Sequence, residues 1–430
     1  MLVLLLGTAT SIAVPQDHAT SHTPPGASLQ ALVDAAAAGD TLVLEAGEYL
    51  GPVTVDRRVT IRGHGAARVV GNEHGSVLTI RANGVVVEDL EIVGSGRNLG
   101  TDDAGILVTG DSARIMGNVL HGNLHGVYVR GAKYIELIGN HVVGLGALDE
   151  TPEVIGADAA AHEDTHHHHS PPGSQALMGN GLHLWNAEGA VVEGNHIQDV
   201  RDGIYVAFTN RAVFRRNRIH DSRYAIHYMY SSDNIVSDNE LWNNVAGAAL
   251  MFSRNLEVAN NTLRDHAGFR AYGLLFQNLD ASVIEQNVVH NNRVGLRLQN
   301  SSANHFGDNH ITGNLVGITI NSSSRDNDFT RNRVGPNLKQ LELTGPVPPA
   351  SWSVDGVGNY WNGALPLDLS GDGISEWPHH VVDVMAGQAE EFPYLQLLIG
   401  SAGIRGLEWA LSRAPIPGTR HITDPHPITR

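Results

Sequence analysis

Apolar residues recur along most of this chain in short runs that are separated by turn residues. Relative to a regularly spaced asparagine, one apolar residue lies three positions before it and another lies two positions after it. A third apolar pair follows a second marker, which is usually glycine. Alternation of apolar and polar residues with a period of two is typical of β-strands. The pattern therefore predicts three short strands in every repeat.

The marker asparagines set the repeat length at about 22 residues, within the range of solenoid repeats. Most gaps between them equal this length, and the exceptions are gaps of 55, 26 and 23. Asparagine and glycine tolerate left-handed backbone, and stacked asparagine side chains can hydrogen-bond from coil to coil. We therefore expect an all-β fold, a right-handed parallel β-helix. The markers are Asn118, Asn140, Asn195, Asn217, Asn239, Asn261, Asn287, Asn309 and Asn332.

The repeats predict a β-helix over residues 26–345, flanked by two other segments. Residues 1–25 contain an apolar run without a preceding Lys or Arg, an incomplete secretory signal that still favours export to the periplasm. Residues 346–430 are expected to form a C-terminal cap and a helical tail, in which Phe392 to Arg413 is amphipathic. That tail could cap the last coil or dock on another protein.

A short helix is expected where the first coil begins. Ser28 to Ala38 has helical spacing of its apolar residues, with Ser28 as the N-cap. Leu29, Leu32 and Val33 would then cover the open end of the solenoid.

The longest gap between markers equals one coil plus an insertion at 147–178. The insertion should protrude, and it contains His166, His167, His168 and His169. Adjacent histidines cannot all face one ion, so this loop would buffer metal loosely. A disordered polar loop whose histidines titrate with pH is an equally good interpretation.

The composition excludes several classes of function. The 430 residues carry a formal net charge of −17, which disfavours nucleic acid as a partner. The chain has no cysteine, so disulfides, thiolate metal sites and thiol catalysis are excluded, and a soft metal site must use methionine or histidine. No other segment is apolar enough to span a membrane.

One outward-facing row of the predicted stack contains ligands for a soft metal. A period of 22 places Met229 beside Met251 on neighbouring strands, with His227 two residues before Met229 and His183 further along the row. Thioether and imidazole groups suit Cu(I), so these four residues are a candidate copper site. The alternative is that another element covers the row and the residues serve packing.

Other residues support further hypotheses. Tyr205, Tyr228 and Tyr230 add aromatic surface that would equally suit sugar stacking. Asp368 and Asp372, with glycines around the second, resemble a calcium-binding loop without EF-hand spacing, although a simple acidic turn explains them equally.

A carbohydrate-active lyase or epimerase is the enzymatic alternative, because many such enzymes are β-helices. Carboxylates such as Asp202 and Asp221, together with His220, occur near the predicted corners, where turn capping explains them. No outward cluster of carboxylates with a Lys or Arg base emerges from the pattern, so we expect no enzyme activity. A scaffold that only contacts a partner protein is a third possibility.

Two stretches resemble the NosD family. They are AIHYMYSSDNIVSDN (225–239) with AALMFS (248–253), and GNYWNGALPLDLSGDGISEW (358–377). The resemblance extends over about residues 28–413, and its most specific parts are HYMY and LMFS.

This resemblance implies a periplasmic, copper-associated accessory factor for maturation of nitrous oxide reductase. It implies copper as the cargo, and as partners an ABC transporter membrane subunit with its ATPase, and nitrous oxide reductase or a copper chaperone. His227, Met229 and Met251 match motif positions of the family, whereas the His-rich insertion has no counterpart in it.

Overall fold

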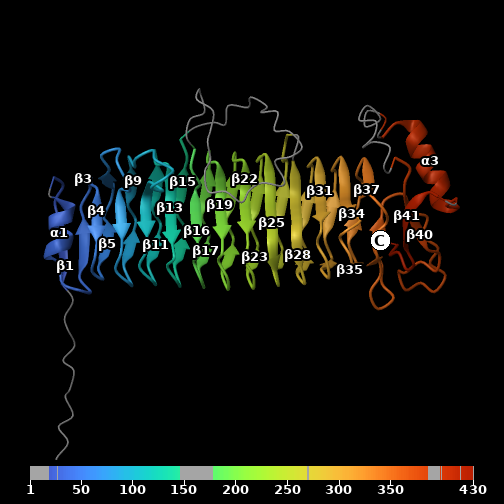
Figure 1. Ribbon diagram of the computed structural model, residues 1–430, viewed down its shortest axis with the longest axis horizontal. Coiled ribbons are helices and arrows are strands. Elements are labelled where there is room, and N and C mark those ends of the chain that lie inside the picture. The colour runs from blue at the N-terminus through green and yellow to red at the C-terminus, as the bar shows by residue number, and fades with distance from the viewer. Residues whose placement is uncertain are drawn as a thin grey trace, which may run out of the picture.

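The chain winds into an elongated parallel β-solenoid with its two ends at opposite ends of the stack (Figure 1). The computed structural model describes residues 19–26, 28–145, 178–268, 271–385, 398, 400–416 and 418–429. Three parallel sheets run along the solenoid, and each regular coil contributes one strand to each sheet. Asparagines of neighbouring coils pair at the predicted spacing, as Asn217 does with Asn239. The structure thus confirms the predicted parallel β-helix and the length of its repeat.

Sheet A has 14 strands within the described residues. They are β1 (Thr20–Thr23), β2 (Thr41–Leu44), β5 (Thr60–Gly63), β8 (Val86–Glu88), β11 (Arg114–Met116), β14 (Glu136–Ile138), β17 (Val191–Glu193), β20 (Val213–Arg215), β23 (Ile235–Ser237), β26 (Glu257–Ala259), β29 (Val283–Glu285), β32 (His305–Gly307), β35 (Asn327–Thr330) and β38 (Ala350–Ser351).

Sheet B has 13 strands in the same described ranges. They are β3 (Gly47–Leu50), β6 (Ala67–Val70), β9 (Glu91–Val93), β12 (Val119–His121), β15 (His141–Val143), β18 (His196–Gln198), β21 (Arg218–His220), β24 (Glu240–Trp242), β27 (Thr262–Arg264), β30 (Val288–His290), β33 (His310–Thr312), β36 (Arg333–Val334) and β39 (Tyr360–Trp361).

Sheet C, which carries the candidate copper ligands, has 12 strands in the part that the structure describes. They are β4 (Val53–Val55), β7 (Leu78–Ile80), β10 (Ala104–Val108), β13 (His125–Arg130), β16 (Leu182–Trp185), β19 (Asp202–Ala207), β22 (Tyr224–Met229), β25 (Ala246–Arg254), β28 (Tyr272–Asp280), β31 (Val294–Gln299), β34 (Val316–Asn321) and β37 (Lys339–Thr344).

The core consists of apolar ladders that continue from coil to coil. Ile115, Leu137, Val192 and Phe214 occupy paired positions in sheet A and are fully buried. Because each strand buries every second residue, one coil contributes only a few core side chains, and stability comes from stacking many coils.

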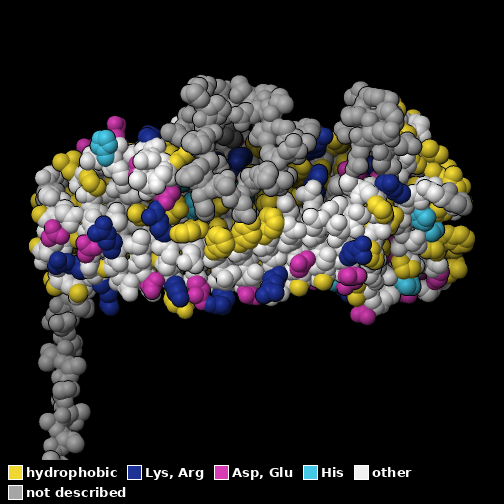
Figure 2. Space-filling view, viewed as in Figure 1, with side chains coloured by type: hydrophobic (Ala, Val, Ile, Leu, Met, Phe, Trp, Pro, Cys, Tyr) yellow, Lys and Arg dark blue, Asp and Glu magenta, His cyan; other side chains and the backbone are white. Residues whose placement is uncertain are grey.

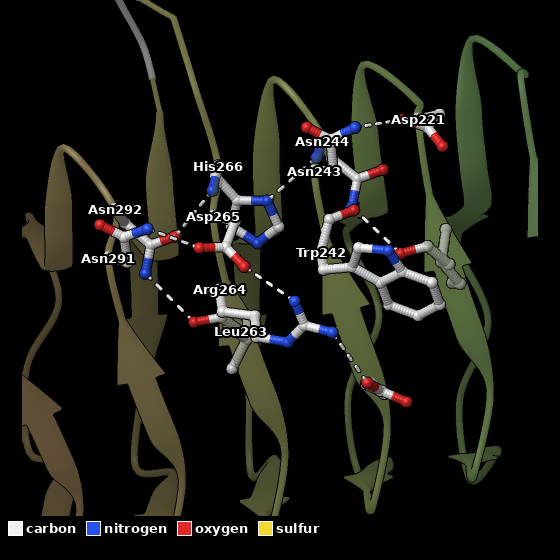
Figure 3. A network of polar contacts seen from close by, with 12 residues as sticks. Asp221, Trp242, Asn243, Asn244, Leu263, Arg264, Asp265, His266, Asn291 and Asn292 are labelled. Carbon is white, nitrogen blue, oxygen red and sulfur yellow. Dashed lines mark hydrogen bonds and ion pairs between the residues drawn. The ribbon is translucent and has the colours of Figure 1, made fainter.

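Asparagine side chains at the corners hydrogen-bond from coil to coil and so form ladders, as predicted. Between sheets A and B, the backbone N–H of Asn217 donates to Asn239 Oδ1 at 3.0 Å, and its side-chain amide donates to the same oxygen. A second ladder runs between sheets B and C through Asn244, His266 and Asn292 (Figure 3). There His266 replaces an asparagine, and its Nδ1 accepts from the backbone N–H of Asn244 at 3.2 Å.

The N-terminal end is capped as the sequence predicts. Helix α1 (Leu29–Ala35) buries Leu29 and Val33, and Ser28 Oγ accepts a hydrogen bond from the backbone N–H of Ala31. The sheets extend beyond the predicted range of 26–345 on both sides, because β1 pairs with β2 and because β38 and β39 add two further strands.

The C-terminal end is closed by a small antiparallel pair, β40 (His379–Asp383) with β41 (Arg420–Asp424). Asp424 ends the main asparagine ladder, since its carboxylate accepts from the Asn359 backbone N–H at 2.7 Å and from Trp361 Nε1 at 2.9 Å. Helix α3 (Ala402–Arg413) lies against β40, and none of its residues is buried. None of the described helices is long and apolar enough for a membrane span.

Candidate functional site

Aromatic side chains alternate along the outer face of sheet C. Tyr128, His183, Tyr205 and His227 occupy paired positions on β13, β16, β19 and β22, and we call them the Tyr–His ladder. Their successive ring centroids lie 4.2, 4.5 and 5.0 Å apart. The ladder follows directly from the repeat, because equal positions in successive coils are about 4.8 Å apart.

His227 is held by a buried carboxylate. Its Nδ1 lies 3.1 Å from Asp202 Oδ2, and the guanidinium of Arg223 donates to both Asp202 oxygens at 2.9 and 2.7 Å. Burial alone would raise the pKa of Asp202, but Arg223 and His227 together lower it far below its usual range. An ionised carboxylate can only accept, so this contact places a proton on Nδ1 of His227. A carboxylate behind the ring is common among metal-binding histidines.

The two methionines lie side by side, as the period predicts. Met229 of β22 pairs with Met251 of β25, and His227 precedes Met229 by two residues on the same face. The Tyr205 hydroxyl lies 3.9 Å from the Met229 sulfur, so the Tyr–His ladder and the methionines form one cluster. The register thus places Met229 and Met251 on neighbouring strands, with His227 two residues before Met229.

The outward row is far less exposed than its orientation predicted. His227 and Met229 are each 7% exposed, and Leu275 of the same row is 8% exposed. At these three positions the row does not face solvent, whereas Trp185, in register with Met229, is 38% exposed. Tyr228 is also not surface: it is fully buried and lies edge-on to Phe214 in the core.

His183 lies apart from the methionines. Tyr205 stands between the rings of His183 and His227, so the structure does not bring both imidazoles to one point. His183 instead contacts His125, and its Nδ1 accepts a hydrogen bond from the Asn180 side-chain amide at 3.1 Å. Burial, and then the charge of His125, hold the pKa of His183 well below its ordinary value.

Asp202 and His125 reach this face because the alternation breaks at the marker glycine. A Cβ on Gly203 would lie 2.3 Å from Ile219 Cγ2, so Gly203 faces the core, and the residue before it turns outward. The turn-capping explanation for Asp202 is therefore corrected: it positions His227. The side chains directly before the glycine markers, Asp202 and His125 among them, were the sequence signal that could have identified these outward residues.

An aromatic ridge borders the methionines. Phe208, Tyr230 and Phe252, which we call the aromatic ridge, stack with ring centroids 5.3 and 5.0 Å apart. Phe208 and Tyr230 are 49% and 41% exposed. All three have left-handed backbone, with φ of 53°, 50° and 50°. Such a backbone is costly for bulky residues. Hydrophobic side chains also gather at mid-length of the face in Figure 2.

Of the other predicted metal ligands, the structure describes Asp368 and Asp372 but not the histidine run. Asp368 accepts the backbone N–H groups of Gly371 at 2.6 Å and Gly373 at 2.9 Å, and Asp372 accepts that of Ile374 at 2.9 Å, so both cap a turn. Calcium binding there stays a prediction. His166, His167, His168 and His169 lie outside the described residues.

Within the ranges that the structure describes, no three His, Cys, Asp or Glu side chains are grouped to hold an ion. A copper site on sheet C would therefore depend on thioether sulfur.

Comparison with solved structures shows the fold. The chain is similar to an exopolygalacturonase of Yersinia enterocolitica, with a TM-score of 0.53, 12% identity, and coverage of 77% of this chain and 75% of that one. It is also similar to the Dettilon tailspike protein, with a TM-score of 0.51, 14% identity, and coverage of 80% and 67%.

Sequence comparison identifies the family. Residues 158–365 match a family model described as periplasmic copper-binding protein (NosD). A protein of Stutzerimonas stutzeri named probable ABC transporter binding protein NosD is 31% identical over 90% of this chain and 86% of its own. A Pseudomonas aeruginosa protein of the same name is 33% identical over 100% of this chain and 94% of its own. The chain therefore belongs to the NosD family.

Proposed function

We propose that this protein binds Cu(I) in the periplasm through His227, Met229 and Met251 on sheet C, and presents it for maturation of nitrous oxide reductase. The observation that carries the proposal is the pairing of Met229 with Met251 beside an imidazole whose Nδ1 is fixed by Asp202. Two thioethers and one imidazole form a soft, neutral ligand set that favours Cu(I) over divalent ions. The family description supports copper and the periplasm.

The low exposure of the ligands suits a cargo that must be protected. Removing water from around a thioether site disfavours oxidation of Cu(I) and loss of the ion to solvent. Because Met251 is only partly buried, the ion would enter and leave along its side of the cluster.

An ABC transporter is the partner that the relatives' names suggest. We infer that its membrane subunit, with its ATPase, accepts this protein, and that a copper chaperone or the reductase meets the aromatic ridge. Two residues of the ridge, Tyr230 and Phe252, directly follow Met229 and Met251 in the chain. A protein docked on the exposed Phe208 and Tyr230 would therefore reach the bound ion. The exposed Leu407 and Trp409 of α3 offer a separate surface to the transporter.

The proposed role is binding and not catalysis. Asp102, beside Tyr128 at the other end of the ladder, is paired with Arg130. Asp202, the carboxylate that contacts His227, is 1% exposed and is already engaged by Arg223 and His227. A general acid or base must contact its substrate, so this carboxylate is badly placed for the chemistry of a lyase or epimerase. Unsaturated products from uronic acid polymers would overturn this part of the proposal.

Anaerobic titration against a chromophoric Cu(I) chelator tests the site. We expect one tightly bound Cu(I), and we expect the double variant Met229→Leu with Met251→Leu to bind it at least 100-fold more weakly. Leucine conserves volume, so the fold should survive. Met116→Leu on sheet A is the matched control and should bind as the parent does. Unchanged affinity in the double variant would refute the site.

A further inference from the structure

Two imidazoles meet on the outer face of sheet B, away from the proposed copper site. His196 begins β18 and His220 ends β21 in the next coil, and their Nε2 atoms lie 2.9 Å apart. Both side chains are partly buried, and that of His220 is 13% exposed. Two ring nitrogens at this distance share one proton when no ion lies between them.

A carboxylate fixes the tautomer of His220. Asp221 Oδ2 lies 2.5 Å from His220 Nδ1, and the other Asp221 oxygen accepts from the side-chain amide of Asn243 (Figure 3). With its proton held on Nδ1, His220 directs the lone pair of Nε2 toward His196. A carboxylate behind a histidine is the usual outer partner of a metal-binding imidazole.

Flat rings hold both imidazoles in place. His141 stacks on His196 with centroids 4.9 Å apart and planes 6° apart, and Trp242 stacks on His220 with centroids 4.4 Å apart. Nε2 of His141 is buried without a hydrogen-bond partner. Burial, followed by the charges of His141, His220 and Arg218, lowers the pKa of His196.

We propose that His196 and His220 form a binding site for a borderline divalent cation, Zn²⁺ or Cu²⁺, with Asp221 orienting His220 and water completing the coordination. Imidazole suits these ions, and bonds of about 2.0–2.1 Å at a tetrahedral angle place two nitrogens roughly 3.3 Å apart. The rings need to separate by only about 0.4 Å from their present distance. The site has no sulfur ligand, so it differs in ion preference from the cluster on sheet C.

Calorimetric titration with Zn²⁺ tests the site in the full-length protein. His162 and His166 to His169 are first replaced by serine, because those residues could bind Zn²⁺ independently. We expect one saturable site on this background. His196→Asn or His220→Asn should weaken it at least 100-fold, and Asp221→Asn should weaken it by about 10-fold to 100-fold.

His310→Asn is the matched control, because His310 is an exposed histidine in the same column of sheet B as His196. It should leave Zn²⁺ affinity unchanged, as should the double leucine variant at Met229 and Met251. Pulsed EPR of the Cu²⁺ form should show two coupled imidazole nitrogens, which gives a readout independent of stability. His196→Gln serves if the asparagine variant folds poorly.

Undiminished Zn²⁺ affinity in the folded His196 and His220 variants would overturn the proposal, as would a Cu²⁺ spectrum without imidazole coupling. Neither result bears on the copper proposal, which depends on other residues and on Cu(I).

Discussion

Replacing His266 with asparagine should remove a measurable part of the acid sensitivity of the solenoid. His266 is 3% exposed and occupies an asparagine position in the ladder between sheets B and C (Figure 3). Its Nε2 is buried without a hydrogen-bond partner. Burial lowers the pKa of His266 to about 3. An asparagine could accept the same Asn244 N–H and would not titrate.

The sign and size of the effect follow from proton linkage. Between about pH 6.5 and pH 3 the unfolded chain protonates residue 266, whereas the folded chain keeps it neutral. Stability therefore falls as the pH drops through this window. At about pH 5 this one histidine should cost about 2 kcal/mol relative to neutral pH.

Guanidinium unfolding at about pH 7.5 and about pH 5, for the parent and the His266→Asn variant, measures this effect. The loss of unfolding free energy on acidification should be about 2 kcal/mol smaller in the variant. The surface variant His310→Asn should keep the parent's loss. Equal acid losses in the parent and the His266→Asn variant would refute the reasoning, because they would mean that His266 protonates freely in the folded chain.

Three further substitutions test the framework and the site. Asn217→Ala leaves the N–H of Asn195 unpaired and removes the side-chain donor to the C=O of Val192, so unfolding titrations should show a loss of about 3 kcal/mol. A loss below about 1 kcal/mol would contradict the ladder's role. Phe306→Ala removes a ring stacked 4.7 Å from Phe329 and should cost about 3–5 kcal/mol, whereas Val283→Ala on the surface should cost far less. Asp202→Asn removes a charged partner of Arg223 and His227 and should cost about 1–3 kcal/mol, because Arg223 is 32% exposed and stays solvated. Wild-type stability together with wild-type Cu(I) affinity would show that Asp202 does not position His227.

The repeat predicted the fold and the register of the methionines because both depend on periodicity alone. A period of 22 places Met229 beside Met251 whatever the corners look like, and the observed pairing confirms it. The N-terminal cap was predictable for a similar reason, since an N-cap serine followed by helical spacing is a local signal.

The sequence did not predict the contact between Asp202 and His227 or the pairing of His196 with His220, because the repeat does not encode these contacts. Strict alternation places Asp202 away from the outer face, and only the inward turn of Gly203 brings it to His227. His196 and His220 occupy different columns, and comparing equal positions in successive coils does not reveal a diagonal contact.

X-ray absorption at the copper edge of the Cu(I)-loaded protein tests the central claim most directly. We expect two thioether sulfurs and one imidazole nitrogen as the direct ligands of copper. We also expect loss of the sulfur signal in the variant that carries Met229→Leu and Met251→Leu. A shell of nitrogen and oxygen alone, or a sulfur signal that survives both substitutions, would contradict the proposal that sheet C holds the copper.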